Sequence, residues 1–166
     1  MNAMPDGEAP LCPSAHPQMA ASRIFGVMGG SVEQPRLLYL EQTIPAAGEI
    51  LALDERVKPI EVFRIAATCV ESACRHFDGQ NCQLAARIVR ILPAVTEALP
   101  PCRIRHNCRW FHQEGRAACT RCPQVITQNC SPSDEMRRAA ERLDHYAQEL
   151  RTLHDNEFGK DWRAKG

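Results

Sequence analysis

The chain has 166 residues with 20 basic and 20 acidic side chains, so its charge alone indicates neither a nucleic-acid partner nor a membrane surface. Aromatic residues make up only 5% of the chain and twelve prolines interrupt it, which predicts a thin core that bound metal would help to stabilise. No run approaches the roughly 20 apolar residues of a membrane-spanning helix. The first 18 residues lack the basic and apolar parts of a secretory signal, so we expect a cytoplasmic protein.

The N-terminal part of the chain predicts a small α+β unit. Residues 1–20 are rich in proline and alanine and should form a mostly irregular tail that carries Cys12. Two apolar runs, 23–28 and 36–44, are separated by a glycine-containing loop, a pattern typical of an antiparallel hairpin. A third strand is expected over residues 60–66, which would deliver the chain to Cys69.

The rest of the chain predicts a loop-dominated, cysteine-rich metal-binding module and a C-terminal helix. Apolar residues recur at spacings of three and four from residue 81, which predicts a helix that Pro93 should end or kink. A second helix is expected from Ser131, as its cap, with Pro132 in the first turn. The domain boundaries expected are a tail at 1–20, one cysteine-rich domain at 21–130, an amphipathic helix at 131–155 and a tail at 156–166.

Nine cysteines are the most informative feature of the sequence. Cys69, Cys74 and Cys82 form the pattern C-x4-C-x7-C, and four more further on form C-x5-C-x10-C-x2-C. Paired disulfides would need an oxidising compartment, and an odd number of cysteines leaves one thiol over. A metalloprotein is therefore the better interpretation of these thiols.

The spacings favour iron–sulfur clusters over zinc. Structural zinc sites are usually built from two C-x2-C knuckles, and this chain has one, between Cys119 and Cys122. Cluster ligands commonly come from irregular loops and include a cysteine followed by proline. Proline follows both Cys12 and Cys122. We therefore predict two [4Fe–4S] clusters, with zinc as the alternative cofactor.

Two sets of four ligands follow from counting the cysteines. The first site needs a fourth ligand besides its three clustered cysteines, and Cys12 is the choice for it, with Cys130, His76 and His16 as competitors. An incomplete first site would instead leave an iron open to substrate, which is the catalytic alternative. The first site is Cys12, Cys69, Cys74 and Cys82, and the second site is Cys102, Cys108, Cys119 and Cys122.

Arginines are interleaved with the cysteines of the second site. A four-thiolate [4Fe–4S] cluster in its oxidised form carries a charge of about −2, which nearby cations would offset. Electron transfer to a protein partner is the function these features favour, and catalysis by the chain itself is less favoured. A nucleic-acid-binding regulator and a zinc-stabilised adaptor remain as alternatives. The arginines are Arg103, Arg105, Arg109, Arg116 and Arg121.

Overall fold

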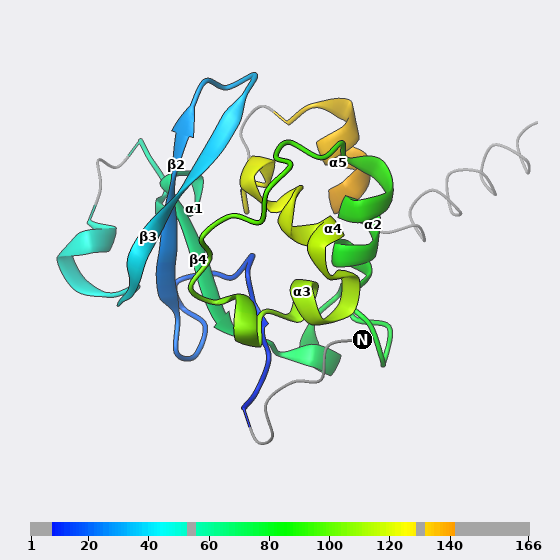
Figure 1. The fold of residues 1–166 in the computed structure, drawn as a ribbon. Coiled ribbons are helices and arrows are strands. Elements are labelled where there is room, and N and C mark those ends of the chain that lie inside the picture. Colours follow the sequence, from blue (N-terminus) through cyan, green and yellow to red (C-terminus); the bar gives the residue numbers. More distant parts are fainter. Residues whose placement is uncertain (1–7, 53–55, 129–131, 142–166) are drawn as a thin grey trace, which may run out of the picture.

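A four-stranded antiparallel sheet forms one side of the molecule (Figure 1). The computed structural model describes residues 8–52, 56–128 and 132–141. The strand order is β1-β4-β2-β3. Helices gather on the other side, which confirms the α+β class (Figure 1). The strands are β1 (Leu11–Cys12), β2 (Arg23–Gly30), β3 (Pro35–Pro45) and β4 (Phe63–Thr68).

The predicted hairpin is confirmed as the antiparallel pair β2 and β3, and both strands extend beyond the expected limits. The tight turn between them begins at Gly30, whose φ is +82° and where an added Cβ would lie 2.3 Å from the Gln34 carbonyl oxygen. Only glycine fits such a position. A bulge between Ile24 and Gly26 interrupts the register of β2 with both of its neighbours.

The third predicted strand starts three residues later than expected. Residues Pro59–Val62 form the helical turn α1, because Pro59 occupies the first turn and Glu61 accepts a hydrogen bond from the Lys58 N–H at 3.1 Å. The chain then enters β4, whose residues Arg64, Ile65, Ala66 and Ala67 are all buried. A strand buried on both faces lies between two layers, and β4 therefore separates the sheet's own core from the cysteine-rich half.

Short helices run through the loop-rich, cysteine-rich half. The helix predicted from residue 81 is confirmed as α2 (Gln83–Ile91), and it ends before Pro93. Ile88 on α2 and Trp110 on α3 belong to the same buried apolar cluster. The remaining helices here are α3 (Arg109–Glu114) and α4 (Arg116–Cys119), with single 3-10 turns η2 (Glu71–Ala73), η3 (Arg105–Asn107) and η4 (Cys122–Gln124); a further turn, η1 (Gly48–Leu51), follows the hairpin.

The C-terminal helix begins two residues later than the sequence indicated. Helix α5 (Asp134–Ala140) is capped by Ser133, whose hydroxyl accepts the Met136 N–H at 3.2 Å, so the cap is not Ser131. Ala139 is buried against the cluster that contains α2. The predicted continuation of this helix to residue 155 lies outside the described residues. No helix within the described ranges is long and apolar enough to cross a membrane.

Candidate metal centres

Pairing of β1 with β4 places the first two cysteines of the first site side by side. Cys12 lies opposite Ala67 in the antiparallel register, and Cys69 is one residue past the end of β4. The Cys69 N–H donates to the Pro10 carbonyl at 2.8 Å and extends this pairing. The N-terminal segment was expected to be irregular, yet the part around Cys12 is an edge strand of the sheet.

A closed loop brings in the other two cysteines of the first site. The Phe77 N–H donates to the Cys74 carbonyl at 3.0 Å, and Phe77 also forms an antiparallel bridge with Cys82. The Gln83 N–H donates to the His76 carbonyl at 2.7 Å, where α2 begins. These bonds fold residues 74–82 back on themselves, so that Cys74 and Cys82 face the same region.

Electrostatics indicate that the four thiols of the first site share one environment. The pKa of Cys12 is raised to about 12, chiefly by burial and also by negative charge on Cys69, Cys82 and Cys74, while the Ser14 N–H acts in the opposite direction. Burial also raises the pKa of Cys82, which is the N-cap residue of α2, and the nearby N–H groups of that helix counter the effect. The Cys12 thiol therefore lies within electrostatic range of the other three cysteines assigned to the first site.

The competing ligands for the first site are placed differently. The two ring nitrogens of His76 face arginines: Nδ1 lies 2.9 Å from Arg87 Nη2 and Nε2 lies 3.3 Å from Arg75 Nε. His16 is exposed and bonds to Gln18 at 3.2 Å. Cys130 lies outside the described residues. Engagement of His76 with two arginines leaves Cys12 as the better-placed fourth ligand.

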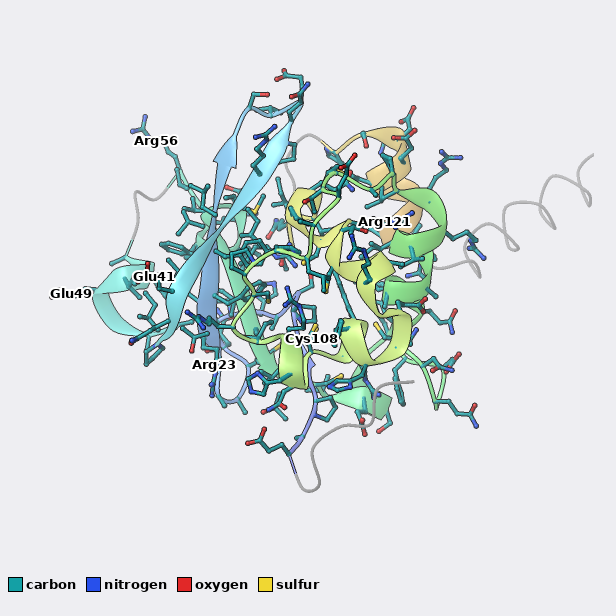
Figure 2. The ribbon with its side chains drawn as sticks, viewed as in Figure 1. Arg23, Glu41, Glu49, Arg56, Cys108 and Arg121 are labelled. Atoms are coloured by element: carbon teal, nitrogen blue, oxygen red, sulfur yellow. The ribbon has the colours of Figure 1, made fainter. Side chains whose placement is uncertain are left out.

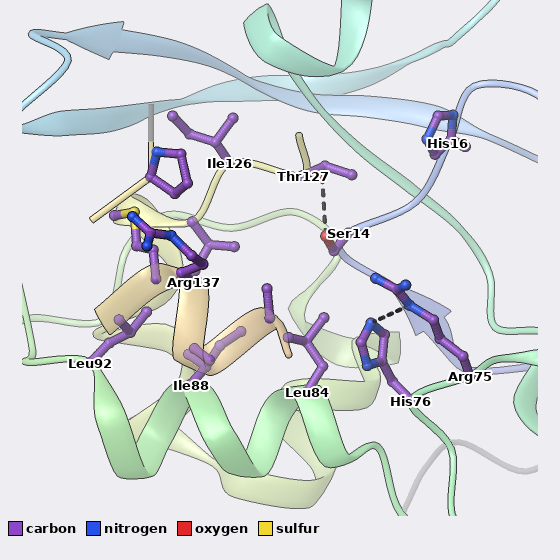
Figure 3. Close-up of a pocket in the computed structure, with 15 residues that line it drawn as sticks. Ser14, His16, Arg75, His76, Leu84, Ile88, Leu92, Ile126, Thr127 and Arg137 are labelled. Atoms are coloured by element: carbon purple, nitrogen blue, oxygen red, sulfur yellow. Dashed lines mark hydrogen bonds between the residues drawn. The ribbon is translucent and has the colours of Figure 1, made fainter. Parts of the chain in front are cut away.

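A cavity of about 400 Å³ lies beside the first site (Figure 3). Its polar wall comes from the segments that carry Cys12 and Cys74, through Ser14, Arg75 and His76. Ser14 is bonded to Thr127 across it at 3.1 Å. The opposite wall is an apolar face of α2, formed by Leu84, Ile88 and Leu92. None of the eight candidate ligands is among the residues that line it.

Helix ends and short turns position the second site. Cys108 is the N-cap of α3, Cys119 is the last residue of α4 and Cys122 begins η4. Together with Cys102 they line a single narrow cavity, whose other walls are mostly apolar and include Pro13. Figure 2 shows Cys108 between the sheet and the helices. The structure therefore brings together the four cysteines assigned to the second site.

Burial disfavours the thiolate form of three cysteines of the second site. Burial raises the pKa of Cys102 to about 11 and raises that of Cys108 well above its ordinary range, and charge on Cys122 adds to both shifts. Burial also raises the pKa of Cys119, although a hydrogen bond and positive charge from Arg105 lower it. Because metal binds the thiolate form, loading must release protons from these groups.

Buried nitrogen donors without acceptors surround the second site. Trp110 is 1% exposed and lines the cavity, yet its indole Nε1 has no hydrogen-bond partner in the part of the chain that the structure describes. The Nε atoms of Arg105 and Arg64 are buried and unpartnered in the same sense. Buried donors are nearly always satisfied in proteins. An anionic cluster with sulfide acceptors fits such a donor set.

The five arginines of the second cysteine segment make contacts within the protein, and Arg103 and Arg116 are exposed. Each donates to an acceptor of the protein, and four of the five arginines donate to backbone carbonyls. Arg109 instead forms an ion pair with Glu71 at 2.6 Å. The carbonyl partners are Glu41 for Arg103, Pro100 for Arg105, Glu97 for Arg116, and Leu92 and Ala117 for Arg121 (labelled in Figure 2).

Sequence reasoning missed Arg64, a buried arginine that contacts a candidate ligand. Arg64 lies in β4, is 0% exposed, and reaches the Cys122 sulfur at 3.5 Å. A signal was present in the sequence, because an arginine in the middle of the apolar run 63–68 must either face water or find a buried partner. Its distance of 58 residues from Cys122 concealed which partner that was.

Eight described cysteines are free, and none is in a disulfide. Within the described ranges, no group of three or more histidine, cysteine or acidic side chains is spaced to hold one metal ion. Four sulfurs around one tetrahedral zinc lie about 3.8 Å apart, given a zinc–sulfur bond of about 2.3 Å. Thiolates on a cubane each bind a different iron and stand farther apart.

Comparisons with family models, curated proteins and solved structures give no match.

Proposed function

We propose that this protein binds two [4Fe–4S] clusters and carries electrons to, or within, a partner enzyme system in the cytoplasm. The observation that carries the proposal is the single cavity that Cys102, Cys108, Cys119 and Cys122 line together, and the electrostatic influence of Cys69, Cys74 and Cys82 on Cys12 supports a second set. Unpartnered buried donors around the second set add support. A reducing compartment would keep these thiols available as ligands.

The residues of the chain have distinct roles in this function. Bound clusters would supply one-electron chemistry. The thiolates would hold them, and the buried walls, such as Trp110 and Pro13 at the second site, would exclude water. N–H groups near the sulfurs, such as those of Trp110 and Phe111 close to Cys108, would stabilise the negative charge.

We expect the two sites to play different parts in electron transfer, because their cysteines differ in exposure to solvent. All four cysteines of the first site are half-buried, whereas Cys108 and Cys122 of the second site are buried. Electron transfer is fastest over short distances, so a partner would exchange electrons more readily through the first site. The second site would then serve as the internal centre.

Metal and acid-labile sulfide analysis of anaerobically purified protein tests the proposal. We expect about eight irons and eight sulfides per chain, with a broad absorption near 400 nm that dithionite bleaches. Zinc without sulfide would contradict it and would favour a structural adaptor. The Cys130→Ser variant tests the competing ligand: it should keep the full iron content, and loss of about four irons would show that Cys130 rather than Cys12 completes the first site.

A further inference from the structure

Arg64 is a buried cation with no carboxylate in ion-pair contact among the described residues. Its side chain is 0% exposed in the middle of β4, and its guanidinium carbon lies 5.5 Å from the centre of the Phe25 ring. Burying a charge without an opposite charge costs several kcal/mol. The chain retains an arginine where an apolar residue would pack, so the guanidinium needs another source of compensation.

The contacts of Arg64 reach the segments that carry ligands of both sites. Nη2 donates to the Pro13 carbonyl at 2.8 Å, one residue beyond Cys12 of the first site. Nη1 donates to the Cys122 carbonyl at 2.9 Å, and Nη2 also contacts the Cys122 sulfur at 3.5 Å. Nη1 donates further to the Val125 carbonyl, just beyond η4.

Two of the three residues that accept hydrogen bonds from Arg64, Pro13 and Cys122, belong to the chain's two cysteine–proline pairs, 12–13 and 122–123. Pro13 is fully buried and also lines the cavity of the second site, so the turn after Cys12 is the wall between the sites. A planar guanidinium can donate to several acceptors in fixed directions, which a lysine ammonium on a flexible stem cannot do. The geometry therefore requires arginine rather than any cation.

We propose that Arg64 is a positioning residue shared by the two sites: it holds both cysteine–proline turns in register and raises the reduction potential of the second cluster. This inference rests on the proposed function. Reduction adds negative charge to a cluster, and a fixed positive charge in a buried, low-dielectric setting favours the reduced form. The effect should be larger at the second site, because Arg64 contacts the Cys122 sulfur but only a carbonyl next to Cys12.

The test is an anaerobic redox titration of the loaded protein, followed by EPR, in wild type and three variants. Arg64→Gln removes the charge and most of the donors, and Arg64→Lys keeps the charge but loses the planar donor set. Arg121→Lys is the matched control, since Arg121 also donates to backbone carbonyls of this half of the protein, namely those of Leu92 and Ala117.

We expect Arg64→Gln to make the second cluster at least tenfold harder to reduce, which is a shift of 59 mV to lower potential for a one-electron couple. Arg64→Lys should shift it in the same direction by less, and Arg121→Lys should leave it unchanged. The first cluster should shift less than the second in each Arg64 variant. If Arg64→Gln does not load, Arg64→Met serves as the charge-free variant, and a wild-type potential in it overturns the proposal.

The two proposals fail in different ways. Wild-type protein without clusters contradicts the proposed function and this role with it. Clusters in wild type, with unchanged potentials in both Arg64 variants, contradict the role of Arg64 alone. A shift of equal size in Arg121→Lys also overturns it, because the effect would then come from loosened packing rather than from the charge at Cys122.

Discussion

The two cysteine sites have the same number of ligands and are built in different ways. The first is assembled by backbone pairing at the edge of the sheet, between β1 and the end of β4, and by the closed loop 74–82. The second is assembled inside an apolar cluster, where Cys108 and Cys122 pack with Ile88 and Trp110. The first site is therefore held mainly by backbone hydrogen bonds, whereas the second site is part of the protein's apolar core.

Their electrostatic surroundings differ as well. At the second site, Arg64 contacts the Cys122 sulfur and Arg105 lowers the pKa of Cys119, so fixed cations face the ligands. At the first site, the groups that lower thiol pKa values are backbone N–H groups, such as that of Ser14 near Cys12. The second cluster should therefore have the higher potential of the two, because cations favour its reduced form.

The largest expected difference is in the stability of the metal-free protein. Replacing Cys108 by serine puts a hydroxyl into the apolar cluster and should lower the free energy of unfolding by about 2 kcal/mol. The same change at half-buried Cys69 should lower it by less than about 0.5 kcal/mol. Urea denaturation of both apo variants checks this, and equal losses would remove the distinction between a core site and an edge site.

High pH should also destabilise the metal-free protein. Cys12 has a pKa of about 12 when folded and about 9 when unfolded, so its stabilising contribution is complete below pH 9 and is lost as the pH rises toward 12. At pH 10 the loss from Cys12 alone should be about 1.4 kcal/mol. Comparing urea midpoints at pH 7 and pH 10 in wild type and Cys12→Ser measures it, and an identical pH dependence in the two proteins would contradict the burial of Cys12.

Gln113 joins the two halves of the comparison. Its side-chain amide accepts the Cys82 N–H at 2.7 Å and donates to the Cys82 carbonyl at 3.0 Å. Helix α3, which begins next to Cys108 of the second site, therefore holds Cys82, a candidate ligand of the first site. Replacing Gln113 by alanine should cost about 1–2 kcal/mol and slow cluster loading at the first site only. Exposed Gln80→Ala is the control. EPR during reconstitution follows the loading of each site. Equal slowing at both sites would show that Gln113 does not act specifically on Cys82.

Arg109→Gln should have the smallest effect. Arg109 follows Cys108 and forms an ion pair with Glu71 at 2.6 Å, and its guanidinium lies 4.9 Å from the centre of the Phe77 ring. The Glu71 side chain is 50% exposed, so water screens the pair and its loss should cost less than about 1 kcal/mol. Glu71 has a φ of +42°, which is strained for a residue with a side chain. Glu71→Gly also removes the ion pair but relieves this strain, so it should lower the thermal unfolding temperature less than Arg109→Gln does. An equal or larger decrease would argue against strain in this loop.

Much of the fold was predictable because local chemistry determines it. The hairpin follows from two apolar runs around a glycine turn, and the end of α2 follows from Pro93. The helical turn at Pro59 was missed because a β-like run of side chains concealed a proline and a capping glutamate, Glu61. The cap of α5 was placed at Ser131 instead of Ser133 because both serines flank the same proline.

The sequence predicts candidate ligands but not their surroundings. It assigns Cys12 to the first site because no other cysteine lies alone in the N-terminal half, and that assignment stays a prediction. The role of Arg64 was not accessible in the same way, since its contact with Cys122 depends on how β4 packs against η4. Contacts between elements far apart in sequence are set by tertiary packing, which spacing along one chain does not encode.

The iron content of single-site variants tests the central claim most directly. Cys69→Ser and Cys108→Ser, each purified anaerobically, should retain about four irons and four sulfides of the eight expected in wild type. Each should also lose the EPR signal of a different cluster, and the double variant should hold no iron. Loss of all iron from either single variant, or zinc in place of iron in every form, would contradict two independent cluster sites.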